Sequence, residues 1–357
     1  MEVAATQVDE QKLEQFMGQA VTDMGAAMNG VLVMIGGELG LWEAMAGQGP
    51  LTSAQIAERS SVEERYVREW ASAQAASGYL DYDAGADAFT LPPEQAMALA
   101  DPDSPVYVVG GYSVVSSAYK DREKIAERFR EGKGFGWHEH HSELFSGTEQ
   151  FFRPGYKAHL VDEWIPSLED VGAKLRAGGS VADIGCGHGI STILMAQAYS
   201  GSTIHGFDYH DASIKRAKEI AESEGVAGNT EFAVASAKDY PGEGYDLVCF
   251  FDCLHDMGDP VGAMSHVRES IAEDGTVMLV EPFAGDKLAD NLNPVGRIFY
   301  AASTVICTPS SLDQEVGLAL GAQAGEDRLR AVAEEAGFTR FRRATETPFN
   351  LILEARP

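Results

Sequence analysis

From Ser180 onward the chain alternates short apolar runs with amphipathic segments, and this pattern limits the folds that it can adopt. The apolar runs, such as "SVADIGCG" and "GTVMLVEP", have the length of strands, and the segments between them have the periodicity of helices. Strict alternation of this kind is typical of a parallel sheet with helices on both faces. The last two apolar runs are joined by a short turn at Thr347 and Pro348, so we expect them to pair antiparallel.

The residues before this region have another pattern. A helix is expected over 13–34, and the segment after it has the order helix, turn, helix and hairpin, which outlines a winged helix. Thr52 or Ser53 is expected to cap the first helix of that pair, and Ser60 or Ser61 the second. The second helix, which would read DNA, mixes two arginines with three glutamates and is not suited to bind phosphate. Dimerisation or domain packing is the preferred interpretation.

The 357 residues suit one large domain with a smaller partner. We predict these two domains with a helical connector between them. Residues 1–95 would form a winged-helix-like dimerisation domain, 96–167 a helical connector or lid, and 168–357 the α/β domain, with a lid insertion at 282–318. The connector is rich in aromatic residues and contains "HEHH". Its spacing does not match the H-E-x-x-H pattern of zinc proteases, so no metal is predicted there.

Charge and apolar patterning disfavour several classes of partner. The chain has 27 basic and 55 acidic residues, a formal net charge of −28, and such a surface repels the phosphates of nucleic acids. The apolar stretch "MNGVLVMIGGELGLWEAM" is interrupted by glycines and a glutamate before it reaches the roughly 20 apolar residues of a membrane span. The four cysteines form no C-x-x-C pair and are expected to be reduced. We therefore expect a cytoplasmic protein that binds neither nucleic acid nor membrane.

The strongest local signal is a glycine-rich turn after the first apolar run of the alternating region. "VADIGCGHGIST" places Asp183, Gly185, Gly187 and Gly189 at alternate positions, and glycine lets the backbone turn sharply and approach a ligand. Asp208 ends the next apolar run, where its carboxylate can accept both hydroxyls of a ribose. Dinucleotides and S-adenosylmethionine both carry such a ribose. An acid at Asp183 would repel a pyrophosphate, and the third glycine comes one residue early for a dinucleotide fingerprint, so S-adenosylmethionine is favoured over NAD.

With these motifs the chain resembles the class I S-adenosylmethionine-dependent methyltransferases over about 168–357. The resemblance implies a Rossmann-like α/β sheet of order 3-2-1-4-5-7-6 with strand 7 antiparallel. It implies S-adenosyl-L-methionine as cofactor and S-adenosyl-L-homocysteine as product, with adenine contacts from Ser236, where many relatives have an acid, and from the backbone of Ala237. Tyr209 would pack on the adenine or stand at the sheet edge. The predicted cofactor-binding residues are Asp183, Gly185, Gly187, Gly189, Asp208, Tyr209, Ser236, Ala237, Asp252 and Cys253.

The order of winged helix, helical connector and class I domain further resembles the dimeric small-molecule O-methyltransferases, including poorly characterised bacterial and mycobacterial relatives. "LHDM" is similar to the histidine–aspartate pair of the plant-type members, which use this histidine as general base. By this resemblance His255 is the catalytic base, and Glu281 in "MLVEP" orients it. A histidine that only lines the pocket, as in enzymes acting on thiols or amines, is the alternative.

The resemblance implies a homodimer formed through the N-terminal domain and a small-molecule acceptor, most simply a hydroxyl, with N-, S- or C-methylation left open. His138, His141, Asn293 and Tyr300 are candidate acceptor contacts, and each could instead have a structural role. No metal is expected near the base, because the two cysteines and the histidine there lack a fourth ligand. A metabolite-sensing winged-helix regulator and a dinucleotide oxidoreductase are the alternatives from other classes.

Overall fold

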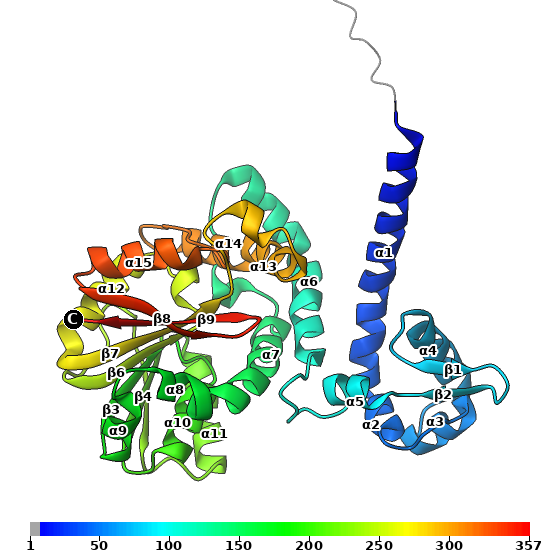
Figure 1. Ribbon diagram of the computed structural model, residues 1–357, viewed down its shortest axis with the longest axis horizontal. Helices are drawn as coiled ribbons and strands as arrows, with labels where there is room; N and C mark the ends of the chain where they lie inside the picture. Colours follow the sequence, from blue (N-terminus) through cyan, green and yellow to red (C-terminus); the bar gives the residue numbers. More distant parts are fainter. Residues whose placement is uncertain (1–7) are drawn as a thin grey trace, which may run out of the picture. The chain divides into compact units, whose positions relative to one another are not determined.

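The computed structural model describes residues 8–357, and its α/β region holds a seven-stranded sheet (Figure 1). The strands are β3 (Ser180–Ile184), β4 (Thr203–Asp208), β5 (Thr230–Val234), β6 (Tyr245–Phe251), β7 (Ile271–Pro282), β8 (Arg340–Glu346) and β9 (Asn350–Arg356). Their order is β5-β4-β3-β6-β7-β9-β8, which is 3-2-1-4-5-7-6 when these seven strands are numbered along the chain. Strand β9 is antiparallel to both of its neighbours, and the other pairs are parallel. The predicted fold class and strand order are confirmed.

Helices cover both faces of this sheet (Figure 1). One face carries α9 (Val171–Arg176), α10 (Ile190–Ala198) and α11 (Asp211–Ser223), and the other carries α12 (Pro260–Ser270) and α15 (Gly325–Glu335). Val267 of α12 and Leu329 of α15 belong to one buried cluster with Val248 and Phe250 of β6. Because β6 is apolar on both faces, its carboxyl end is held rigidly, and the residues after Phe251 start from a fixed position.

A helical insertion separates β7 from α15. It contains a 3-10 helix (Leu288–Asn291), α13 (Pro294–Ala302), a π-helix (Ser303–Cys307) and α14 (Thr308–Asp313). The insertion is bonded to the loop after β6, because Ser311 Oγ donates to Met257 O at 2.8 Å and Gly321 N to His255 O at 3.1 Å. The predicted lid insertion is thus a helical segment attached to the edge of the sheet where ligands bind in this architecture.

The remaining helices come after the N-terminal hairpin and before β3 in the sequence. They are α5 (Pro93–Leu99), α6 (Val109–Glu131), a 3-10 helix (Trp137–Glu139), α7 (Glu143–His159), a π-helix (Leu160–Trp164) and α8 (Ile165–Ser167). The chain forms two compact units, one of residues 1–116 with 145–154 and one of 117–144 with 155–357. Helices α6 and α7 each contribute to both units, so the connector is shared, and the domain boundaries stay predictions.

The N-terminal elements follow the expected order of helices and hairpin. They are α1 (Glu10–Glu38), α2 (Leu41–Met45), α3 (Ser53–Ser60), α4 (Glu64–Ala76), β1 (Asp81–Asp83) and β2 (Ala88–Thr90). Thr52 caps α3 in a capping box with Gln55, as predicted. The predicted cap of the second helix is wrong. Ser61 adopts a left-handed conformation with φ of 58° and ends α3, so α4 starts later, with Glu63 at its N-cap.

Helix α1 is long and largely exposed. Of the helices in residues 8–357, it is the one long and apolar enough to cross a membrane by length and composition, and one such helix near an N-terminus is weak evidence of a span. Asn29, Val33 and Gly36 are buried against its own domain. Another face of the helix exposes a series of methionine and valine side chains.

Candidate active site

The turn between β3 and α10 has the geometry of a ligand-binding loop. Gly185, Gly187 and Gly189 all have positive φ, at 72°, 54° and 78°. A Cβ at Gly185 would lie 2.9 Å from Cys253 Sγ, and one at Gly189 would lie 2.8 Å from the ring of Phe232. A Cβ at Gly187 would meet nothing within 4 Å. The first and last glycines are therefore required for packing, and the middle one leaves open space beside the backbone.

Two acidic side chains flank this loop. Asp183 is 0% exposed, and its Oδ2 accepts hydrogen bonds from the hydroxyls of Ser191 and Thr192 at 2.6 Å each. Its Oδ1 is buried without a hydrogen-bond partner among the described residues, and burial raises the pKa of the carboxyl to about 6. One oxygen of Asp183 thus fastens the loop to α10, and the other has unused acceptor capacity.

Asp208, at the end of β4, holds the loop from the other side. Its two oxygens accept from Gly187 N at 2.9 Å and from His210 N at 2.8 Å. A carboxylate has about four lone-pair sites, so acceptor capacity remains for a diol. Burial raises the pKa of Asp208.

The predicted adenine contacts lie on exposed segments. Tyr209 is 53% exposed, and burial of the rest of its side chain raises the pKa of its phenol. Ser236 is exposed and begins a turn in which its N donates to Asp239 Oδ1 at 3.0 Å and its Oγ accepts from Lys238 N at 3.1 Å. These bonds fix the conformation of the turn, and Ala237 lies within it. The adenine roles of Tyr209, Ser236 and Ala237 stay predictions.

The segment after β6 begins with a strained residue. Asp252 has a φ of 50°, which an L-residue rarely adopts, and its carboxylate is held on both oxygens. Tyr156 donates its hydroxyl to Asp252 Oδ2 at 2.8 Å, and Asn350 Nδ2 donates to Oδ1 at 2.9 Å. Cys253 Sγ then donates to Ile184 O at 3.2 Å. These contacts from α7, β9 and β3 fix a sharp turn that directs the next two residues.

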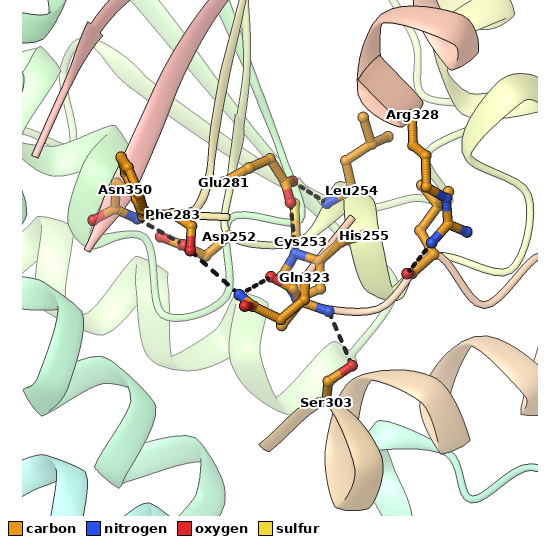
Figure 2. A network of polar contacts seen from close by, with 12 residues as sticks. Asp252, Cys253, Leu254, His255, Glu281, Phe283, Ser303, Gln323, Arg328 and Asn350 are labelled. Atoms are coloured by element: carbon orange, nitrogen blue, oxygen red, sulfur yellow. Dashed lines mark hydrogen bonds and ion pairs between the residues drawn. The ribbon is translucent and has the colours of Figure 1, made fainter. Parts of the chain in front are cut away.

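His255 and Glu281 form the centre of the site (Figure 2). His255 is 4% exposed and Glu281 is 1% exposed. His255 Nδ1 lies 2.6 Å from Glu281 Oε2, and Glu281 Oε1 accepts from Leu254 N at 3.1 Å. The carboxylate is thus fixed by the backbone next to the histidine and by the ring itself. The two residues predicted as base and orienting group are brought together.

The pKa values of this cluster are strongly perturbed. Burial lowers the pKa of His255, but the charge of Glu281 and the thiol of Cys307 outweigh it and raise that pKa well above the ordinary value. Burial, reinforced by the charge of Glu281, raises the pKa of Asp252 and of Asp256 to about 7 each. Perturbed groups gathered at one sheet edge are typical of a functional site. The cluster contains three carboxyl groups, those of Asp252, Asp256 and Glu281, and His255 is the residue among them that can carry a positive charge.

Several residues of this cluster were not predicted from the sequence. Tyr156 and Asn350 bind Asp252 from 96 and 98 positions away, and no local pattern indicates such pairings. Cys307 lies beside His255 at the end of a π-helix within the insertion. Asp256 was visible in "LHDM", but its charge interactions depend on the fold.

The four predicted acceptor contacts have varied surroundings. Asn293 caps α13, since its Oδ1 accepts from Gly296 N at 2.9 Å and its Nδ2 donates to Asp290 O at 3.1 Å. His141 Nδ1 accepts from Glu143 N at 3.3 Å. His138 belongs to the 3-10 helix Trp137–Glu139, and Tyr300 to α13. Asn293 thus has a structural role as a helix cap, which the sequence left open as the alternative to acceptor contact. Within the described residues, no contact with His255 is observed for any of the four.

No group of three histidine, cysteine or acidic side chains suited to a metal ion is found among residues 8–357. The arginines of α4 are occupied by neighbouring glutamates: Arg65 pairs with Glu69 at 2.6 Å and Arg68 with Glu64 at 2.8 Å. Ion pairs within the helix reduce the positive charge that would attract phosphate.

Comparison with known families assigns both regions. The model of the Rv2258c-like winged HTH domain matches residues 27–101, and that of a methyltransferase domain matches residues 175–337. Residues 175–337 therefore carry a methyltransferase domain, and the fold is that of the class I S-adenosylmethionine-dependent methyltransferases. The cofactor is S-adenosylmethionine, and the N-terminal region is a winged-helix domain.

Individual relatives are more distant. The chain is 28% identical over 171 residues to the 27-O-demethylrifamycin SV methyltransferase of Amycolatopsis mediterranei, a match that covers 46% of this chain and 55% of that protein. It is 35% identical over 129 residues to the trans-aconitate 2-methyltransferase of Streptomyces coelicolor, covering 36% and 42%. The chain therefore spans about half the length of these curated relatives.

Solved structures resemble the chain over nearly its whole length. An O-methyltransferase family protein from Burkholderia thailandensis has a TM-score of 0.67 at 16% identity, with 98% of this chain and 99% of that one covered. Human N-acetylserotonin methyltransferase in complex with S-adenosylmethionine has a TM-score of 0.65 at 16% identity, with 99% of this chain and 99% of that one covered. At these identities the likeness shows the fold alone.

The residues at the ends of β3, β4 and β6 fit S-adenosylmethionine. The ligand carries a sulfonium and an ammonium cation, and the site offers Asp183, Asp208, Asp252 and Asp256, each with a pKa raised by burial. Such enclosed carboxylates are stabilised by a bound cation. The open space beside Gly187 and the unpartnered oxygen of Asp183 are further features of a ligand site.

Proposed function

We propose that the protein transfers the methyl group of S-adenosylmethionine to a hydroxyl of a small molecule, with His255 as general base and Glu281 as the residue that orients it. The observation that supports this most is the 2.6 Å contact between His255 Nδ1 and Glu281 Oε2. A carboxylate on Nδ1 leaves Nε2 as the nitrogen that can receive a proton from an acceptor. The names of the matched relatives, several of them O-methyltransferases, agree with this proposal.

The reaction needs alignment and one proton transfer. When bound, S-adenosylmethionine supplies a methyl group already activated by its sulfonium, so the chain mainly has to position the acceptor oxygen in line with it. Asp208 would hold the ribose, Asp183 and the glycine loop the methionine portion, and Ala237 the adenine. The acceptor hydroxyl gives its proton to Nε2 of His255, and the resulting imidazolium is stabilised by Glu281.

The protonation state of His255 must change for this role. Its raised pKa means that the ring holds its proton near neutral pH in the protein without ligands. A cation bound beside the ring lowers that pKa, because two positive charges repel. Occupation of the donor site would therefore prepare the base by moving its pKa toward the working pH.

The experiment that tests the function is a methyl-donor consumption screen over phenols, amines and thiols, read by mass spectrometry. Methylated phenols with the wild type, and loss of most turnover with unchanged S-adenosylhomocysteine affinity in His255→Ala, are expected. Turnover that survives in His255→Ala would contradict the base role. Methylation of thiols or amines alone would retain the assignment as a methyltransferase and contradict the proposed hydroxyl acceptor.

We also propose that the protein is a homodimer joined through α1. Five exposed side chains lie at alternating spacings of four and three along this helix, with exposures of 50% to 72%, and they are Met17, Val21, Met24, Met28 and Val31. This spacing forms the seam of a left-handed helix pair. A second copy of α1 would bury the seam, which is too apolar to face water along a free helix. The net negative charge of the chain and the ion pairs of the α4 arginines support the proposal that the protein does not bind nucleic acid. We also propose that it is cytoplasmic.

A further inference from the structure

The end of the insertion binds the segment that carries His255. Residues 311–321, from the last turn of α14 onward, form what we call the strap, and each residue from 255 to 258 is bonded to it. Donors of the strap reach every carbonyl of this segment: Gly321 N donates to His255 O at 3.1 Å, Gln314 Nε2 to Asp256 O at 3.1 Å, Ser311 Oγ to Met257 O at 2.8 Å and Leu318 N to Gly258 O at 2.9 Å. In return, Gln314 Oε1 accepts from Gly258 N at 3.0 Å.

The strap is itself attached to the α/β domain at both ends. Leu320 is 6% exposed and belongs to the buried cluster around β6. Arg328 of α15 donates from Nη1 to the carbonyl of Leu320 at 3.1 Å (Figure 2). Near the start of the strap, Glu315 pairs with Lys238 from the turn after β5, and Lys238 Nζ also lies 3.1 Å from Asp259 Oδ2 at the N-cap of α12. Because the strap has these attachments of its own, it can hold the segment 255–258 in place.

The backbone of the strap is strained. Val316 has a φ of 69° and Ala319 a φ of 50°, in the left-handed region that residues with a Cβ rarely adopt. Val316 is 72% exposed, so burial of its side chain does not offset this cost. Such conformations persist where the surrounding contacts fix them, and they cluster at functional sites. The bonds to residues 255–258 are among the contacts that fix the strap.

Two side chains of the strap link it to the segment of the base. Ser311 is 0% exposed, and its Oγ both donates to Met257 O at 2.8 Å and accepts from Ala319 N at 3.0 Å. The side-chain amide of Gln314 binds residues 256 and 258, and its Nε2 also donates to Ser310 O of α14 at 3.0 Å. Each side chain thus joins two segments that are otherwise held by backbone bonds alone.

We propose that the insertion positions the catalytic base through the strap, with Ser311 and Gln314 as positioning residues. Glu281 directs the ring of His255, and the strap fixes the backbone from which that ring projects. The insertion that would close over the acceptor therefore also sets the position of the base. The hold of the strap on residues 255–258 is independent of any acceptor, whereas its effect on turnover rests on the proposed function.

The test compares Ser311→Ala with Ser310→Ala in the full-length protein. Both variants remove one hydroxyl from adjacent residues of α14, and the two residues are 0% and 2% exposed. The Ser310 hydroxyl has no hydrogen-bond partner among the described residues, whereas the Ser311 hydroxyl has two. Hydrogen exchange read by mass spectrometry should become about tenfold faster over residues 255–258 in Ser311→Ala and stay unchanged in Ser310→Ala.

Two further measurements separate positioning from folding. In Ser311→Ala the carbon-13 resonance of the His255 ring should broaden or split, because the backbone that carries the ring is no longer fixed, and in Ser310→Ala it should match the wild type. With an acceptor found in the screen, kcat should fall about tenfold in Ser311→Ala at unchanged S-adenosylhomocysteine affinity. Urea denaturation of each variant verifies folding.

Gln314→Glu is the second variant, and it carries the test if Ser311→Ala does not fold. Gln314 is exposed, so this change leaves the core intact. The glutamate keeps an oxygen for Gly258 N and loses both donated bonds, so exchange over residues 255–258 should again become faster.

Unchanged exchange over residues 255–258 in both Ser311→Ala and Gln314→Glu would overturn the proposal. Equal changes in Ser311→Ala and Ser310→Ala would also overturn it, because they would reflect repacking of α14. If exchange responds as expected but the wild type methylates no acceptor, the proposed function fails and the hold of the strap remains. If the wild type methylates a hydroxyl and Ser311→Ala keeps its kcat, the positioning role is lost and the proposed function remains.

Discussion

Glu281 binds two successive residues: its Oε2 lies 2.6 Å from His255 Nδ1, and its Oε1 accepts from Leu254 N at 3.1 Å. One carboxylate at the end of β7 thereby fixes both the backbone and the ring that follow β6. Strands β6 and β7 are neighbours in the sheet, so the contact depends on a parallel pairing that the core keeps rigid. The direction of the imidazole is set by the sheet and not by a flexible loop.

Glu281→Gln tests this orienting role. The amide removes the negative charge that favours the imidazolium, so we expect turnover to fall by about 10- to 100-fold with little change in S-adenosylhomocysteine affinity. Steady-state kinetics and calorimetry measure the two quantities. Glu335→Gln, at an exposed position of α15, is the matched control and should behave as the wild type. A turnover unchanged in Glu281→Gln would remove Glu281 from the mechanism.

The titration of His255 provides a second prediction. Burial lowers its pKa, the charge of Glu281 and the thiol of Cys307 outweigh this, and the net shift is upward. We expect the His255 resonance, among the nine histidines, to titrate well above the usual pKa of roughly 6.5 in the free protein. S-adenosylmethionine should lower that pKa more than S-adenosylhomocysteine, because only the former carries the sulfonium charge.

Carbon-13-labelled histidine followed by NMR over a pH series measures both effects, and His255→Asn identifies the resonance. Equal shifts with the two ligands would show that the sulfonium charge does not act on the base. A free-protein pKa near the ordinary value would contradict the electrostatic description of the pair.

The buried carboxyl of Asp256 should make the free energy of unfolding depend on pH. Burial raises its folded pKa to about 7, so the folded state binds a proton that the unfolded chain releases near pH 4. Its contribution is fully present below that unfolded value and is lost as pH rises through about 7. Above pH 7 the charged group destabilises the fold, and we expect Asp256→Asn to raise the free energy of unfolding by about 1 to 2 kcal/mol at pH 8.

Urea denaturation at about pH 5 and pH 8 measures this difference. The gain should disappear at the lower pH, where Asp256 is already neutral in the folded state. Glu222→Gln on the exposed face of α11 is the control and should change stability little at either pH. A gain of equal size at both pH values would indicate a packing effect and not ionisation.

Tyr156→Phe tests the contact that fixes Asp252. The variant removes the donor that lies 2.8 Å from Asp252 Oδ2 and leaves only Asn350 on that carboxylate among the bonds described. We expect a loss of about 1 to 3 kcal/mol above pH 7, where Asp252 is charged, and a smaller loss at acidic pH. Denaturation at two pH values measures it. Tyr119→Phe, at a tyrosine that is 64% exposed, should cost almost nothing.

The fold could be predicted from the sequence because each of its signals is local or periodic. The alternation after Ser180 indicates a parallel sheet, and the glycine spacing with Asp208 indicates where its ligand lies. The pair His255 and Glu281 was predicted from the resemblance to the plant-type O-methyltransferases, and the structure brings the two side chains together. Parallel strands end at one edge of a sheet, which brings such residues together.

Contacts between distant segments could not be predicted in this way. Tyr156 and Asn350 reach Asp252 across 96 and 98 positions, and only the folded chain places them there. Asp252 itself reads as an ordinary acid after a strand, yet it adopts a left-handed conformation that its two partners stabilise. Ser61 shows the same limit at short range, because a serine suits an N-cap and equally ends a helix in the left-handed region.

The seam of α1 gives the last prediction. Met24, at its centre and 59% exposed, would face the same helix of a second copy, so Met24→Lys places a charge in an apolar contact and should give a monomer. Light scattering after gel filtration should show the wild type at twice 38.3 kDa and the variant at 38.3 kDa. Ala26→Lys adds the same charge on an exposed position of α1 outside the seam and should remain dimeric. A monomeric wild type would contradict the proposed homodimer, and a dimeric Met24→Lys would place its interface on another surface.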